Sequence, residues 1–143
     1  MLELSGRFGM KTIAVRARLE CELAEITDES ERSEFLDLYR ISESGAEKFI
    51  RACFKLLCQI SFYTGGEKEV RAWTVSEGGT ALDAAAAIHS DMARGFIRAE
   101  IYNLDDVVAQ GSFEKLRGTD KMKLCGKEHQ ISGGDLVIIR FKV

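Results

Sequence analysis

The hydrophobic pattern of the chain changes its period at about Gln59, and this change limits the folds that the chain can adopt. From Leu19 to Cys58 apolar residues recur at helical spacing. One face of the predicted helix after Ser44 is apolar throughout, with Ala46, Phe49, Ile50, Cys53, Phe54 and Leu57. We expect that face to pack against another element. From Gln59 onward apolar and polar residues alternate, as in half-buried strands.

Local signals place the individual elements. Three pairs combine a capping side chain with an acid three positions later, and they predict helix starts at Asp28 with Glu31, Ser44 with Glu47 and Thr80 with Asp83. Four alternating segments are expected to be strands: 59–64, 68–75, 96–102 and 135–143. The first two flank a glycine-bearing loop, which predicts a hairpin. Two brief extended pieces surround Lys123 and His129.

The order of these elements predicts an α+β fold. Two strands, one short helix over 81–89, a third strand and a last strand form the order of a β-grasp (ubiquitin-like) sheet, in which one helix crosses one face. The polar stretch 104–118 has only short helical segments. A helical segment is expected to precede this domain.

Composition excludes several classes of function. The net charge is −3, shared by both halves, so any nucleic-acid surface must be a local patch, and we expect neither DNA nor a membrane as a partner. No apolar run approaches the roughly 20 residues that span a bilayer. The cytoplasm is the expected location. The four cysteines form no C-x-x-C pair and are expected to be reduced thiols: Cys21, Cys53, Cys58 and Cys125.

Two apparent chemical motifs do not meet their spacing requirements. "GRFGMKT" (6–12) resembles a phosphate loop, but Met10 stands where glycine must precede the lysine, and Gly6 is one residue too close to Lys11. We therefore expect no nucleotide to bind this segment. His89, His129 and the cysteines never approach metal-ligand spacing, so no metal site is expected.

His89, Asp91 and Arg94 allow two interpretations. They could serve a small enzyme or a ligand sensor, with His89 and Asp91 as an acid/base pair. Alternatively, His89 shares a helical face with Leu82 and Ala85, which favours a histidine packed near a helix C-terminus. A lone histidine without an adjacent nucleophile favours the second interpretation.

A set of cations in and near the predicted strands could contact RNA phosphates: Lys68, Arg71, Arg94, Arg98 and Arg140. Trp73 and Phe96 could stack on bases. Alternatively, Trp73 belongs to the sheet core and neighbouring acids balance the cations. Alternation points Arg98 and Arg140 away from the apolar face and toward water, whereas Arg71 shares a face with Trp73.

Several segments together resemble a known family. "KEVRAWTV" (68–75), "AAAAIHSDMARGFIRAEI" (84–101), "GKEHQI" (126–131) and "GGDLVIIRFKV" (133–143) resemble the C-terminal TGS domain of YchF-type, or Obg-like, ATPases, a branch of the Obg-related P-loop GTPase superfamily. "ELAEITDESERSEFL" and "EKFIRACFKLLCQISFYT" are similar to that family's linker. "IAVRARLECEL" (13–23) resembles its last nucleotide-domain strand and base-side loop, in which Ala17 and Glu20 match an S-A-x-x-E pattern and Arg16 departs from it.

The resemblance implies a domain plan and a role. Residues 1–23 would be a remnant of the nucleotide domain, 24–58 a helical linker and 59–143 the TGS domain. The parent family binds and slowly hydrolyses ATP, or sometimes GTP, with Mg. This chain lacks the phosphate loop and would need no cofactor. It would bind the ribosome, through rRNA or a ribosomal protein, or its own nucleotide domain. Met92 and Ala93 depart from the family's motif, so partner specificity could differ.

Overall fold

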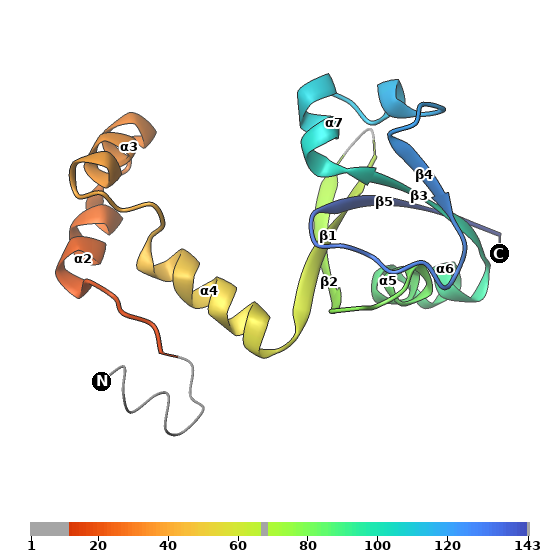
Figure 1. The fold of residues 1–143 in the computed structure, drawn as a ribbon, viewed down its shortest axis with the longest axis horizontal. Coiled ribbons are helices and arrows are strands. Elements are labelled where there is room, and N and C mark those ends of the chain that lie inside the picture. The colour runs from red at the N-terminus through yellow and green to blue at the C-terminus, as the bar shows by residue number, and fades with distance from the viewer. Residues whose placement is uncertain (1–11, 67–68, 143) are drawn as a thin grey trace. The chain divides into compact units, whose positions relative to one another are not determined.

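The chain consists of two compact units, Met1–Leu56 and Leu57–Val143. A computed structural model describes residues 12–66 and 69–142. Figure 1 shows the helices of the first unit and the sheet of the second. The glycine-bearing segment 6–11, which resembles a phosphate loop, and Lys68 lie outside the described residues.

The described part of the first unit is helical, with α2 (Ala17–Glu25), α3 (Glu29–Leu38) and α4 (Gly45–Leu56). The predicted caps hold two of these helices. Asp28 accepts hydrogen bonds from the amides of Ser30 and Glu31, and Ser44 and Glu47 cap each other's backbone amides. The strand expected within 13–23 is wrong, since residues 12–16 have no regular structure and α2 follows. A strand needs a partner strand, and the described part of this unit contains none.

The apolar face of α4 does not pack as expected. Phe49 is 60% exposed and Ile50 56% exposed. The first unit has few buried residues, with Leu23, Ser44 and Gly45 among the described ones. Exposed apolar side chains that are contiguous on one face mark interaction surfaces in other proteins.

The second unit has the strand order and directions of a β-grasp sheet. Its strands are β1 (Gln59–Gly65), β2 (Val70–Ser76), β3 (Phe96–Asn103), β4 (Met122–Cys125) and β5 (Asp135–Phe141). They lie in the order β2-β1-β5-β3-β4, with β1 parallel to β5 and the other pairs antiparallel. The extended piece around Lys123 is β4, and the one near His129 is a single bridge between Thr80 and Gln130.

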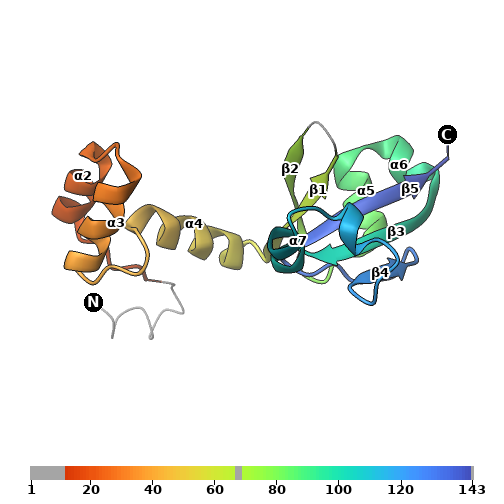
Figure 2. The same cartoon turned by 90° about the horizontal axis from the view of Figure 1, so that it is seen from above.

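One face of the sheet carries the main core. Helices α5 (Ala81–Ile88) and α6 (Ser90–Arg94) cover this face (Figure 2). The centre of the core is fully buried and includes Phe62, Ala85, Ala99 and Val137. The predicted capping box at the start of α5 is present, because Thr80 and Asp83 each accept from the other's backbone amide. The described ranges contain no helix long and apolar enough to cross a membrane.

The other face of the sheet is partly covered, which the sequence did not predict. Helix α7 (Leu104–Gln110) and the short helix η1 (Glu114–Leu116) bring Leu116 and Phe113 onto Tyr102 and Leu136. The polar stretch 104–118 contributes only a few apolar contacts, so its pattern does not show which face it covers. The part of this face nearer the end of β5 carries charged side chains.

Gly95 forms the corner between α6 and β3. A Cβ atom built on Gly95 would overlap the carbonyl oxygen of Lys142, so only glycine permits this close approach. Lys142 donates its backbone amide to the carbonyl of Gly95 at 2.9 Å. The sequence predicts a helix over 81–89 and then a strand over 96–102, and the structure has this order with α6 added between them. A β-bulge between Phe96 and Arg98 then leaves Ile97 59% exposed, so Ile97 does not share the core face with Ala99.

Candidate functional site

Two arginines stand opposite each other on the sheet face away from α5. Arg98 of β3 pairs in register with Arg140 of β5. Val137 and Ile139 point into the main core, so alternation places Arg140 on the opposite face, as predicted. Arg98 is exposed, and it has no ion pair with another described residue. Like charges directly opposite on one face repel, so this pair requires compensation.

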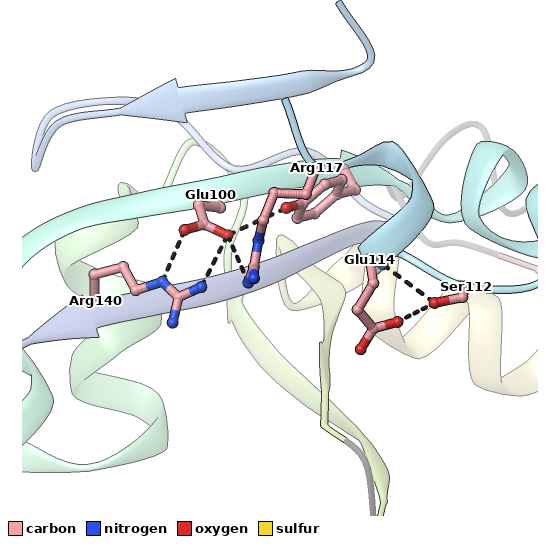
Figure 3. A network of polar contacts seen from close by, with 6 residues as sticks. Glu100, Ser112, Glu114, Arg117 and Arg140 are labelled. Atoms are coloured by element: carbon pink, nitrogen blue, oxygen red, sulfur yellow. Dashed lines mark hydrogen bonds and ion pairs between the residues drawn. The ribbon is translucent and has the colours of Figure 1, made fainter. Parts of the chain in front are cut away.

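Glu100 supplies that compensation. It lies two residues beyond Arg98 on the same face of β3 and is only 6% exposed. Its Oε1 accepts from Nε of Arg140 at 2.7 Å, and its Oε2 accepts from Nη2 of the same residue at 3.2 Å. The predicted orientation of Arg140 toward water therefore holds only in part. We call Glu100, Tyr102, Arg117 and Arg140 the Glu100 cluster (Figure 3).

Two further residues complete the Glu100 cluster. Tyr102 donates its hydroxyl to Oε2 of Glu100 at 3.1 Å, and Nη2 of Arg117 lies 3.4 Å from the same oxygen. Figure 3 shows Arg140 and Arg117 on either side of the Glu100 carboxylate. Arg117 was not among the predicted site residues, because it follows η1 and no local sequence pattern links it to β3.

The electrostatics follow from these contacts. The hydrogen bonds from Arg140 hold the pKa of Glu100 below its ordinary value, although burial acts in the opposite direction. Burial also raises the pKa of Tyr102, so its hydroxyl stays a donor. Glu100 is therefore a carboxylate at neutral pH, and its hydrogen bonds raise the pKa of Arg140.

The other predicted cations lie elsewhere. Arg71 is on the α5 face of the sheet with Trp73 and pairs with Glu69 at 3.1 Å. Arg94 pairs with Asp91 on α6. The structure therefore does not bring either residue to the face that holds Arg98 and Arg140.

The two predicted stacking aromatics belong to the sheet. Phe96 is 7% exposed in the main core, and Trp73 packs against that core while donating its indole N–H to Thr64 at 2.9 Å. The structure favours the alternative of core aromatics over base stacking.

His89, Asp91 and Arg94 form a helix cap at an exposed corner. Nδ1 of His89 accepts from the Asp91 amide at 3.1 Å, and the Asp91 carboxylate contacts Arg94. The expectation that His89 is packed is wrong, since its side chain is 62% exposed. The reason is that α5 ends at Ile88 and the extended backbone of His89 turns its side chain away from that helix.

The remaining predicted position is Ala17. It begins α2 and is exposed. Within the described ranges, no group of three or more His, Cys, Asp or Glu residues could hold a metal ion. All four cysteines are free thiols, as predicted.

The fold and the site define a class of protein segment: a β-grasp domain with an arginine-bearing sheet face, preceded by helices. The family model YchF-GTPase_C, described as "Protein of unknown function (DUF933)", matches residues 59–142. The chain belongs to the YchF family. It is 41% identical over 133 residues to the ribosome-binding ATPase YchF of Bacillus subtilis, covering 93% of this chain and 36% of that protein.

A second curated relative and a solved structure also support membership of the YchF family. The ribosome-binding ATPase YchF of Haemophilus influenzae is 41% identical over 141 residues, covering 99% of this chain and 39% of that protein. The solved YchF GTPase of Schizosaccharomyces pombe has a TM-score of 0.76 and 30% identity, covering 92% of this chain and 34% of that one. A GTP-binding protein of Pyrococcus horikoshii shares the fold, with a TM-score of 0.58 and 20% identity over 99% of this chain and 40% of that one.

The chain thus spans well under half the length of these relatives. The matching family model is that of the C-terminal part of YchF, and the 143 residues contain no phosphate loop. Enzyme activity is accordingly not indicated for this segment.

Proposed function

We propose that this chain is the TGS-type binding module of a YchF protein and contacts ribosomal RNA through the sheet face of Arg98 and Arg140. The observation that supports this proposal is the register pair itself. Two arginines stand directly opposite on a partly open sheet face, an arrangement that disfavours folding and suits a polyanion. The relatives are named ribosome-binding ATPases, which fits such a partner.

Phosphate contacts of this kind are sensitive to salt and indifferent to sequence. Two or three of them give a log-log salt slope of roughly −1.4 to −2.7, at about 0.7 to 0.9 per neutralised phosphate. The test is co-sedimentation with purified ribosomes across a salt series, comparing the wild type with the double variant Arg98→Glu, Arg140→Glu. Arg18→Glu on α2 is the control for charge reversal outside the sheet, since its side chain is 93% exposed.

We expect the double variant to lose binding while Arg18→Glu retains it. Circular dichroism melts must show that the double variant is folded, because Arg140 also contacts Glu100. Unchanged binding by the folded double variant would place the interface elsewhere.

A second candidate partner is the nucleotide domain of the same family. The exposed apolar face of α4, with Phe49 and Ile50, favours this candidate, because an apolar surface of that kind suits a protein partner. The experiment is a pull-down with a separately produced nucleotide domain of a YchF relative. Phe49→Asp with Ile50→Asp should abolish capture, and Arg98→Glu should not affect it. Equal capture by the α4 variant would contradict this candidate.

In the whole protein, ATP or GTP with Mg would belong to the nucleotide domain. For this chain alone we predict no nucleotide binding, because the spacing in "GRFGMKT" does not allow backbone amides to surround a phosphate. Calorimetric titration with Mg-ATP and Mg-GTP should give a flat trace. Saturable heat at micromolar nucleotide would contradict this prediction.

A further inference from the structure

We infer that the Glu100 cluster is a phosphate clamp, in which Glu100 holds the guanidinium groups of Arg140 and Arg117 ready to contact one RNA phosphodiester. This inference rests on the proposed function and extends it. It adds Arg117 to the binding residues. It also means that Glu100 favours the binding of a polyanion although its own charge is negative.

The geometry of the shared oxygen supports the clamp. Nη2 of Arg140 and Nη2 of Arg117 lie 3.2 Å and 3.4 Å from the same Oε2 of Glu100. Two groups that contact one oxygen atom are close enough for a single phosphate to contact both. Each guanidinium has five N–H donors, so donors remain after these bonds. The side chains of Arg140 and Arg117 are 41% and 48% exposed, so part of each reaches solvent.

The charges leave the surface positive. Glu100 is one carboxylate against two guanidinium groups, and Arg98 adds a third cation opposite Arg140. Glu114 offsets part of this charge, because the hydrogen bond from Ser112 lowers its pKa and the nearby charge of Arg117 lowers it further. Three cations thus face two carboxylates at this part of the sheet. An anion that binds here replaces no existing partner of Arg98 among the described residues.

Pre-organisation explains why an acid would strengthen binding. Ordering a flexible side chain at an interface costs about 0.5–1.5 kcal/mol, which corresponds to roughly two- to tenfold in affinity. Glu100 orders Arg140 before binding, because it is buried and holds that guanidinium through two hydrogen bonds. On charge alone, removal of Glu100 would strengthen RNA binding. The clamp predicts the opposite result.

The experiment measures binding of a labelled, mixed-sequence RNA oligonucleotide across a salt series by fluorescence anisotropy, with purified ribosomes as a second probe. Glu100→Gln keeps the shape of the side chain and one acceptor oxygen. Arg140→Lys keeps the charge but loses the two-point contact. Arg117→Gln removes one cation of the clamp, and Arg18→Gln removes one cation on the first unit as the control.

We expect Glu100→Gln and Arg140→Lys each to weaken RNA binding by roughly two- to tenfold. Arg117→Gln should reduce the magnitude of the salt slope by about 0.7 to 0.9, whereas Arg18→Gln should leave it unchanged. If Glu100→Gln does not fold, Arg140→Lys and Arg117→Gln still test the clamp.

The outcomes separate the clamp from the proposed function. In one outcome, Glu100→Gln binds RNA as tightly as the wild type or more tightly, while Arg98→Glu with Arg140→Glu does not bind. The clamp is then wrong, but RNA contact through the sheet face of Arg98 and Arg140 is still supported. An unchanged salt slope for Arg117→Gln also overturns the clamp. If the folded double variant binds normally, the proposed function itself fails.

Discussion

Glu100 carries a negative charge where only 6% of the residue meets solvent. A buried carboxylate is stable only when opposite charges and hydrogen-bond donors surround it, and here two arginines and the neutral hydroxyl of Tyr102 do so. Removing one member of such a group destabilises the fold more than replacing the whole group with apolar residues would, because the remaining charge stays buried without its partner. The Glu100 cluster therefore bears on stability as well as on the proposed binding.

The lowered pKa of Glu100 makes stability depend on pH. The unfolded chain takes up the proton first as the pH falls, because its glutamate titrates near 4.5 and the folded one titrates below that. The stabilisation is fully present above about pH 4.5 and is lost as the pH falls through the folded pKa.

We predict that the difference in free energy of unfolding between the wild type and Glu100→Gln is largest at neutral pH and narrows in acid. Urea melts at a series of pH values measure it. The pKa values of Glu47 and Asp83 are also lowered, so these residues too make stability depend on pH. Their contribution is the same in the wild type and in Glu100→Gln, and it cancels in the difference. A difference that stays constant down to strong acid would show that Glu100 is not ionised in the fold.

Gly95 gives a second prediction at this scale. Gly95→Ala should lower the free energy of unfolding by about 1–3 kcal/mol, because its methyl group would overlap the Lys142 carbonyl and force the backbone apart. Gly126→Ala is the matched control, since a Cβ there meets no heavy atom within 4 Å. Denaturant melts of both variants test the contact. Equal stability of the two variants would mean that the backbone at Lys142 does not pass so close to the corner.

The elements begin where their side chains can satisfy free backbone amides. Thr80 and Asp83 each bond the other's amide at the start of α5, and Ser44 and Glu47 do the same at the start of α4. These short-range bonds fix where a helix begins before any packing is considered.

We predict that Thr80→Ala destabilises the second unit by about 1 kcal/mol, through the loss of one cap bond to the Asp83 amide. Thr80→Ser keeps a hydroxyl at this position and should stay close to the wild type. The measurement is the midpoint of a denaturant melt. If serine were as destabilising as alanine, the effect would come from the lost methyl group and not from the cap.

Local chemistry was enough to predict most of the elements. Capping pairs identified the helix starts, and alternation identified the strands and the side of the sheet on which Arg98 and Arg140 lie. The contacts that sequence analysis missed join distant residues. Glu100 contacts Arg117, which is 17 residues away in the sequence, and Arg140, which is 40 residues away. The bulge at Ile97 arises from pairing with β5, so alternation along β3 alone cannot show it.

At the scale of the whole molecule, the two units differ in how they are stabilised. The second has two apolar clusters on the two faces of one sheet, whereas the described part of the first relies on helix caps and a small core. The boundary between units falls at residues 56 and 57, near the predicted start of the domain at residue 59. The domain plan itself stays a prediction.

We predict that residues 59–143 fold without the preceding residues, because the sheet and α5 together form a core of their own. The segment should unfold cooperatively, with a midpoint within a few degrees of the main transition of the full chain. Calorimetry of both proteins checks this. A segment without a cooperative transition, beside a full chain that has one, would show that the first unit contributes to the fold.

The central place of β5 in the sheet has a consequence for synthesis. β5 lies between β1 and β3, yet it is made after every other strand. While a nascent chain has reached only β4, the β1–β2 pair and the β3–β4 pair are separate, and each has an unpaired strand edge. Arg140 has not yet been made, so it cannot pair with Arg98. Such long-range closure is slow compared with local helix formation. The sheet is therefore complete only when translation has delivered β5. Nascent chains arrested at Gly134 should be digested by a protease that spares chains that extend beyond Phe141.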